Sequence, residues 1–141
     1  MAGYVTKSHD FVYEGEMVNG AAAPVQNGIL MVPDATDPLK LVLPAADTNS
    51  KFVCKEVTTI YDGVTAYRFV VDAVAKRYYF VENGFDINDS QAYDKRTYTT
   101  KVGDELRAHP VLLGEEFVTT MVTGTPVAGT AYGVKADGTI G

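Results

Sequence analysis

Two histidines are the first residues to consider for chemistry, because an imidazole can act as a base near neutral pH. His9 precedes Asp10, which could orient its ring, and His109 precedes Pro110 at what reads as a strand end or loop. A base needs a nucleophile within hydrogen-bond reach, and the sequence has no Gly-x-Ser-x-Gly or comparable turn to present one. Both histidines are interpreted as structural or surface residues, and we expect no enzyme activity.

Acidic side chains offer two possible metal sites. Asp86–Ser90 resembles the opening of a calcium loop, but the sixth position is Gln91 instead of Gly and the twelfth is Thr97 instead of Glu. An Asx-rich turn explains that segment better. The pairs Asp104–Glu105 and Glu115–Glu116 would share an ion only if folding brought them together. Solvated loop charges are the simpler interpretation, so we expect no metal and no cofactor.

The single cysteine, Cys54, excludes an intramolecular disulfide and a cysteine-based zinc site. Its neighbours Phe52 and Val53 indicate a buried thiol that packs as a small hydrophobic group. The first ten residues lack an apolar run of signal-peptide length, and no segment approaches the roughly 20 apolar residues of a membrane-spanning helix. We therefore expect synthesis in the cytoplasm and no membrane association.

The net charge of −6 is unevenly distributed. Residues 1–50 carry two basic and six acidic groups, residues 51–101 eight and seven, and residues 102–141 two and five. Phosphate contacts dominate nucleic-acid affinity, and this chain has no basic stripe to make them. Direct binding to nucleic acid is therefore not expected.

The sequence predicts short strands separated by tight turns. Asn-Gly and Asp-Gly pairs accept the positive φ of hairpin turns, and they occur at Asn19–Gly20, Asn27–Gly28, Asp62–Gly63, Asn83–Gly84 and Asp137–Gly138. Residues 51–61 and 64–72 form the clearest hairpin, because their Val, Tyr, Phe and Thr suit a pleated surface. Residues 77–82 continue the pattern. We predict a central three-stranded antiparallel meander over about residues 51–82.

Further strands are predicted at 29–32, 39–43, 97–102, 117–123 and 131–135. Only residues 86–94 and 104–113 could hold a helical turn, so little helix is expected. The predicted fold is mainly β, an antiparallel sandwich or barrel. Residues 1–15 would be an N-terminal arm or first strand, and residues 16–141 a single β-rich domain.

Two long tracts without any charge lie near opposite ends of the chain, at Met17–Pro33 and Phe117–Val134. Each contains a Met-Val-x-Gly step, which predicts similar turns at Gly20 and Gly124. The predicted meander can form a core by itself, so the tracts are interpreted as surplus to it and available to other subunits, because interface cores are depleted of charge. The residues expected at the interface are Met17, Val18, Met31, Val32, Phe117, Met121 and Val122.

The C-terminal stretch resembles the small head-decoration (capsid cement) and other minor structural proteins of tailed bacteriophages. The resemblance lies in Gly103–Arg107 (GDELR), Gly114–Phe117 (GEEF), Met121–Gly124 (MVTG) and Ala136–Gly141 (ADGTIG), with an Ala/Pro/Gly-rich segment at Asn19–Gly28. It implies a non-enzymatic β-rich protein that binds the major capsid protein on the outside of the assembled head, as a homotrimer, and so resides in the virion.

Two alternative functions stay open at this point. The chain could be a tail or neck component of the virion, since β domains there use the same strand-and-turn patterns. It could instead be a small ligand-binding β-barrel, with a pocket near Tyr67, Phe69 and Tyr79. The tyrosines near the meander, which also include Tyr61 and Tyr78, are by default core or interface residues.

Overall fold

The computed structural model describes residues 4–7, 17–59, 63–82 and 99–141, and within these ranges every regular element is a strand. This confirms the mainly β fold. The strands are β1 (Tyr4–Lys7), β2 (Met17–Asn19), β3 (Val25–Gln26), β4 (Leu30–Pro33), β5 (Lys40–Val42), β6 (Asp47–Thr59), β7 (Thr65–Ala73), β8 (Tyr79–Val81), β9 (Thr99–Thr100), β10 (Glu105–Leu106), β11 (Ala108–Pro110), β12 (Glu116–Thr119) and β13 (Ala131–Val134).

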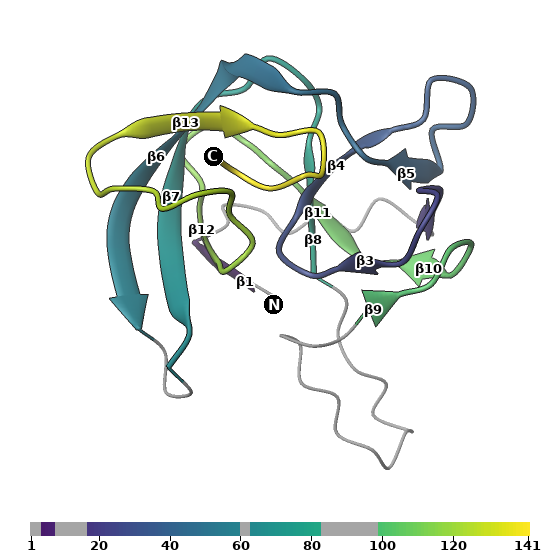
Figure 1. Ribbon diagram of the computed structural model, residues 1–141. Helices are drawn as coiled ribbons and strands as arrows, with labels where there is room; N and C mark the ends of the chain where they lie inside the picture. The colour runs from purple at the N-terminus through teal and green to yellow at the C-terminus, as the bar shows by residue number, and fades with distance from the viewer. Residues whose placement is uncertain (1–3, 8–16, 60–62, 83–98) are drawn as a thin grey trace.

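Most of these strands belong to two sheets. A five-stranded sheet has the order β1-β12-β7-β6-β13, a six-stranded sheet has the order β10-β2-β5-β4-β8-β11, and β3 pairs with β9. Among the named strand pairs only β2 and β5 run parallel. In Figure 1 the long strands β6 and β7 lie on one side, β4, β8 and β11 in the middle, and β3, β9 and β10 on the other side. The middle strands therefore have a region on each face in which apolar side chains must pack.

The predicted hairpin is confirmed as β6 and β7. Phe52 lies opposite Val71 and Cys54 opposite Phe69, so that alternate side chains point to one face of the sheet. Phe52, Cys54 and Phe69 are all buried. Gly63, which lies just before β7, has a φ of 85°, the left-handed conformation that glycine adopts readily.

The predicted three-stranded meander over residues 51–82 is wrong in its third strand. Residues 79–81 do form a strand, β8, but it pairs with β4 and β11 in the six-stranded sheet, and β12 takes the place beside β7. The side chains of β8 explain this position. Phe80 packs on one side of the strand while Tyr79 and Val81 pack on the other. A strand that is apolar on both faces is most stable between two cores.

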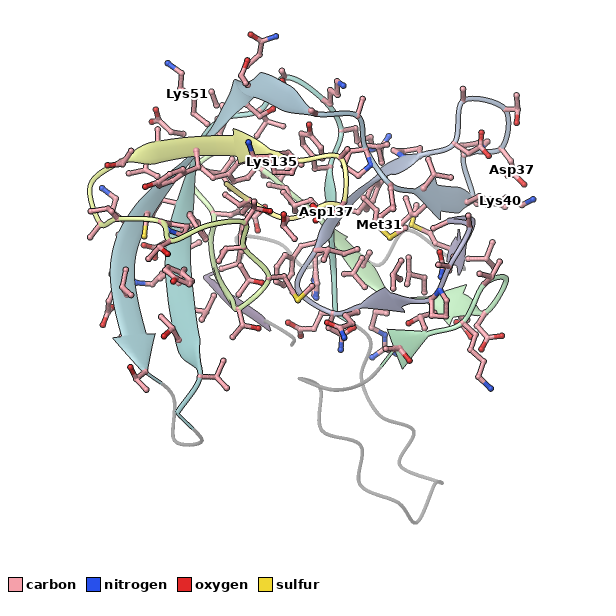
Figure 2. All side chains as sticks on the ribbon, in the orientation of Figure 1. Met31, Asp37, Lys40, Lys51, Lys135 and Asp137 are labelled. Carbon is pink, nitrogen blue, oxygen red and sulfur yellow. The ribbon has the colours of Figure 1, made fainter. Side chains whose placement is uncertain are left out.

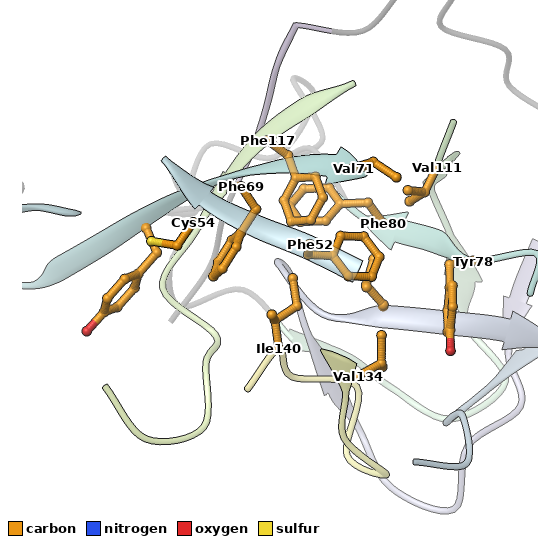
Figure 3. Packing of buried hydrophobic residues seen from close by; sticks show 12 residues of the cluster. Phe52, Cys54, Phe69, Val71, Tyr78, Phe80, Val111, Phe117, Val134 and Ile140 are labelled. Carbon is orange, nitrogen blue, oxygen red and sulfur yellow. The ribbon is translucent and has the colours of Figure 1, made fainter. Parts of the chain in front are cut away.

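In the part of the chain that the structure describes, buried apolar side chains form two cores. The first core lies between the five-stranded sheet and the middle strands, and aromatic rings dominate it: Phe80 and Phe117 are tilted at 38° with centroids 4.6 Å apart. Figure 3 shows Val134 and Ile140, from the C-terminal segment, closing this core on one side. The second core lies on the other face of the middle strands. It contains Met17, Ala21, Val25, Ile29, Met31, Leu41, Tyr79, Val81, Leu106 and Ala108.

The remaining strand predictions have mixed outcomes. Strands are found within or overlapping 29–32, 39–43, 97–102, 117–123 and 131–135, as β4, β5, β9, β12 and β13. The suggestion of a helical turn over 104–113 is wrong, because β10 and β11 occupy it. Leu106 and Ala108 both point into the second core, and this period of two is that of a strand. The other possible helical turn, 86–94, lies outside the described residues.

The two uncharged tracts meet within one chain. The hydroxyl of Thr119, in the second tract, donates a hydrogen bond of 2.8 Å to the carbonyl of Gly28, in the first. Buried side chains from both tracts complete the cores, among them Ile29, Leu30 and Phe117. The interpretation that the tracts are surplus to the core is therefore wrong for these residues.

The predicted likeness of the turns at Gly20 and Gly124 is also wrong. Gly124 has a φ of 76°, whereas Gly20 does not have a positive φ. The backbone at Gly20 is instead closely packed, since a Cβ there would lie 3.1 Å from the Cβ of Lys40 and 3.3 Å from the carbonyl oxygen of Leu41. The Met-Val-x-Gly steps share a sequence but not a conformation.

Candidate interaction surface

The seven residues expected at an interface divide into two groups. Met17, Met31 and Phe117 are buried within the chain, with exposed fractions of 5%, 0% and 2%. Figure 2 shows Met31 well inside the molecule, whereas Lys40 and Lys51 extend outward from it. The half-buried group consists of Val18, Val32, Met121 and Val122. Folding brings Met17, Met31 and Met121 together at the second core, and Val32, Phe117 and Val122 at the first.

The part of the second tract that reaches the surface is the segment Thr123–Ala131, which we call the neutral loop. Every residue in it except Pro126 is exposed, and none is charged. Val127, at 60% exposed, is its most prominent apolar side chain. Interface cores are depleted of charged residues, and this surface shares that property.

Backbone hydrogen bonds hold both ends of the neutral loop. Cys54 of β6 donates from its N–H to the carbonyl of Thr130 at 3.0 Å and accepts from the N–H of Gly129 at 2.7 Å. At the other end, the N–H of Thr123 donates to the carbonyl of Ile140 at 2.9 Å. A loop fixed in this way loses little conformational freedom on binding, which favours affinity.

One side chain also braces the middle of the neutral loop. The hydroxyl of Tyr132, on β13, accepts a 2.7 Å hydrogen bond from the N–H of Val127. The sequence reveals that this tract lacks charge, but its division into a buried part and an exposed part depends on pairing with β6 and the C-terminal segment. Sequence reasoning therefore chose Met121 and Val122, which anchor the loop, and missed Val127.

Other apolar side chains are exposed on turns. Leu112 and Leu113 are 47% and 63% exposed in the turn between β11 and β12. Among the described residues, the other large apolar side chains with exposed fractions above 40%, apart from Val127, are Leu39, Leu43, Val57 and Val102. Single exposed apolar residues are ordinary on protein surfaces and by themselves identify no site.

Asp47 is the centre of a buried polar cluster. Its carboxylate accepts hydrogen bonds from the hydroxyls of Ser50 at 2.7 Å and Tyr78 at 2.8 Å, and from the N–H of Asn49 at 2.8 Å. Burial alone would raise the pKa of Asp47, but these bonds stabilise the charged form and lower the pKa from 3.8 to about 2. Burial and the bond to Asp47 raise the pKa of Tyr78. The cluster links β6 to the start of β8, so its role is structural.

An ion-pair network crosses the five-stranded sheet. Arg68 on β7 contacts Glu116 on β12 at 2.6 Å and Glu56 on β6 at 3.3 Å. The Glu116 side chain is only 11% exposed, whereas that of Glu56 is 52% exposed. Surface pairs contribute little, so the Arg68–Glu116 pair accounts for most of the network's stabilising effect.

His109 lies on β11 and is buried. Its Nε2 atom is 3.8 Å from Oε1 of Glu82, a distance at which the two would form an ion pair if the ring were protonated. It borders a small hollow with a cavity volume of about 10 Å³. Ligand pockets usually span about 300–1,000 Å³. The hollow is lined by Phe80, His109, Pro110, Val111, Glu115, Glu116 and Phe117.

The structure does not bring the two acidic pairs together. Glu115 accepts a 2.7 Å hydrogen bond from the N–H of Leu112, and Glu116 binds Arg68. Asp104 and Glu105 are exposed at an edge of the other sheet. Within the described ranges no three or more His, Cys, Asp or Glu residues could hold a metal ion together.

The tyrosine and cysteine predictions can be compared with the two cores. Tyr67 and Phe69 belong to the first core and Tyr79 to the second, so these residues do not line one pocket as a ligand-binding barrel would require. Cys54 is buried as predicted, and its burial raises the pKa of the thiol. The candidates His9, Asp10, Tyr61 and Asp86–Ser90 lie outside the described residues.

Comparison with protein-family models, with curated proteins and with solved structures finds no match. In the part of the chain that the structure describes, no helix has the length and apolar character to cross a membrane.

Proposed function

We propose that this chain is a non-enzymatic structural protein of a tailed-phage virion, a decoration protein that binds the major capsid protein on the outside of the assembled head. The observation that carries the proposal is the neutral loop. It is exposed, uncharged over Thr123–Ala131, and fixed by backbone hydrogen bonds to β6 and to the C-terminal segment. The choice of the major capsid protein as the partner rests on the resemblance of the C-terminal motifs to head-decoration proteins.

The physical role in this proposal is stabilisation by binding. A protein that binds only the assembled shell stabilises that state by mass action. Many symmetric copies add avidity, and association as a homotrimer would increase it further. The acidic groups outside the neutral loop keep the free protein soluble until it meets the shell.

Binding to expanded capsids that lack decoration protein tests the proposal. Purified protein is mixed with such capsids and the bound fraction is measured by co-sedimentation over a range of protein concentrations. Val127→Asp introduces a charge at the centre of the neutral loop and should weaken binding by about tenfold or more, since an unpaired charge is costly to bury. Val102→Asp is the matched control, because Val102 is similarly exposed at 52% but lies in the turn between β9 and β10.

Three results would count against the proposal. The first is no binding of the wild type at micromolar concentration. The second is equal loss of binding in both variants, and the third is an unaffected Val127→Asp variant. Binding to purified tails instead of heads would assign the chain to the tail or neck.

A further inference from the structure

The long strand β6 extends beyond the strand that covers its outer edge. The last β13 partner of β6 is Val53, which pairs with Ala131, and the neutral loop continues the contact only as far as Cys54. On one side, residues 55–59 lie along β7, which pairs with residues 56–59, and the register shifts at Lys55, between Cys54 and Glu56. In the described part of the chain no strand pairs with their other side, which we call the free edge. Figure 1 shows the ends of β6 and β7 projecting past the other strands of their sheet.

The free edge is accessible along its whole length. All five residues, Lys55–Thr59, are exposed, and the apolar Val57 at its centre is 43% exposed. Unpaired edges present backbone N–H and C=O groups that can pair with another extended chain. Val57, Thr58 and Thr59 are β-branched and suit a strand in such a pairing.

We propose that the free edge pairs with the same edge of a second copy of this chain, in antiparallel register about Val57. This register places Val57 opposite its own copy and Glu56 opposite Thr58 of the second copy, within the regularly paired residues 56–59. The exposed valines then cover each other, and no two like charges lie directly opposite. Side chains opposite one another in antiparallel strands are close enough for each of these pairings to matter.

Charge disfavours the two registers centred nearer the start of the free edge. Antiparallel pairing centred on Glu56 would place two carboxylates opposite each other, and pairing centred on Lys55 would do the same with two ammonium groups. Like charges in directly opposite positions are destabilising. Among registers centred on the first three residues of the free edge, only the one at Val57 avoids this repulsion.

The resulting contact is isologous, with one two-fold axis at Val57, which is the commonest symmetry of protein dimers. A pairing of five residues is small compared with the roughly 1,000 Å² that stable interfaces exceed, so the association is weak in solution and strengthens where copies are concentrated. The contact does not depend on shell binding or on the neutral loop, and a homotrimer formed through another surface is compatible with it.

Cysteine cross-linking tests the register. Val57→Cys places two thiols at the two-fold axis, where directly opposite residues have Cα separations of about 4.5–5.5 Å, within the range of a disulfide. Under mild oxidation this variant should form a covalent dimer at least about fivefold faster than Val102→Cys, which presents a thiol at a comparably exposed site on another part of the surface. The wild type reports any background from the buried Cys54.

A charge substitution tests the same contact without oxidation. Val57→Lys should weaken concentration-dependent self-association by about fivefold in analytical ultracentrifugation, because two ammonium groups would meet at the axis. Val102→Lys should associate as the wild type does. The proposal is overturned if Val57→Cys cross-links no faster than Val102→Cys, or if Val57→Lys and Val102→Lys associate alike. Neither result would bear on the effect of Val127→Asp on shell binding.

Discussion

Asp47 illustrates at the residue scale how a single carboxylate stabilises this fold. Because its pKa is lowered on folding from 3.8 to about 2, the folded state favours the charged form. The resulting stabilisation, about 2 kcal/mol, is present above pH ~4 and is lost as the pH falls toward 2. Asp47→Asn should lower the free energy of unfolding at pH 7 and reduce its decrease between pH 4 and pH 2, measured by urea denaturation.

The control for this prediction is Asp72→Asn, which removes one negative charge from an exposed position on β7. It should leave the stability at pH 7 nearly unchanged. If Asp47→Asn shows the wild-type pH dependence over this interval, the buried carboxylate is not responsible for it.

Phe117 and Val118 are adjacent on β12 but face opposite sides of the five-stranded sheet. Phe117 packs against Phe52, Phe69 and Phe80 in the first core, whereas Val118 is half-buried opposite Arg68. Phe117→Asp would bury an unpaired charge and should unfold the domain. Val118→Asp should remain folded, as circular dichroism would show. A folded Phe117→Asp variant would contradict the assignment of Phe117 to the core.

Two glycines with the same backbone conformation allow a test at the scale of elements. Gly63 and Gly138 both have a φ of 85°, so alanine at either position is strained. A Cβ at Gly63 meets nothing within 4 Å, whereas a Cβ at Gly138 would lie 2.6 Å from the carbonyl oxygen of Leu30 on β4.

The Gly138→Ala substitution should therefore reduce stability by about 1–3 kcal/mol more than Gly63→Ala does, since the added methyl group is overpacked. Both variants carry the same backbone strain, so the difference between their denaturation midpoints reports the added contact with β4. Equal losses would show that the C-terminal turn does not pack closely against β4.

Local patterns in the sequence predict where the strands lie better than they predict which strands pair with each other. The β6–β7 pair is predictable because an Asp-Gly pair, Asp62–Gly63, separates two segments rich in residues that suit strands. The partners of β8 are not, because Phe80 and the flanking Tyr79 and Val81 show only that both faces are covered. Which strands cover them depends on pairings between residues far apart in the chain, and no local pattern encodes these.

The candidate surface was predictable only in part for the same reason. The absence of charge from residue 117 to residue 134 marks this tract in the sequence. The division of the tract at Thr123 depends on Thr119 bonding to Gly28 and on Cys54 bonding to the neutral loop. Composition alone could not separate the buried Phe117 from the exposed Val127.

At the scale of the whole molecule, the two proposed contact surfaces, the neutral loop and the free edge, lie next to each other along β6. The neutral loop meets β6 at Cys54, and the free edge begins at the next residue, Lys55. Shell binding and self-pairing would thus use neighbouring parts of one side of β6. Val127→Asp and Val57→Lys are chosen to affect them separately.

The most direct test of the proposed function is an electron cryomicroscopy reconstruction of expanded capsids, initially without decoration protein, after incubation with this protein. The account predicts additional density at symmetric positions on the outer surface, with residues 123–131 against the shell and no such density for Val127→Asp. Capsids that stay bare at micromolar protein, or copies attached through a different surface with the neutral loop facing solvent, would contradict it.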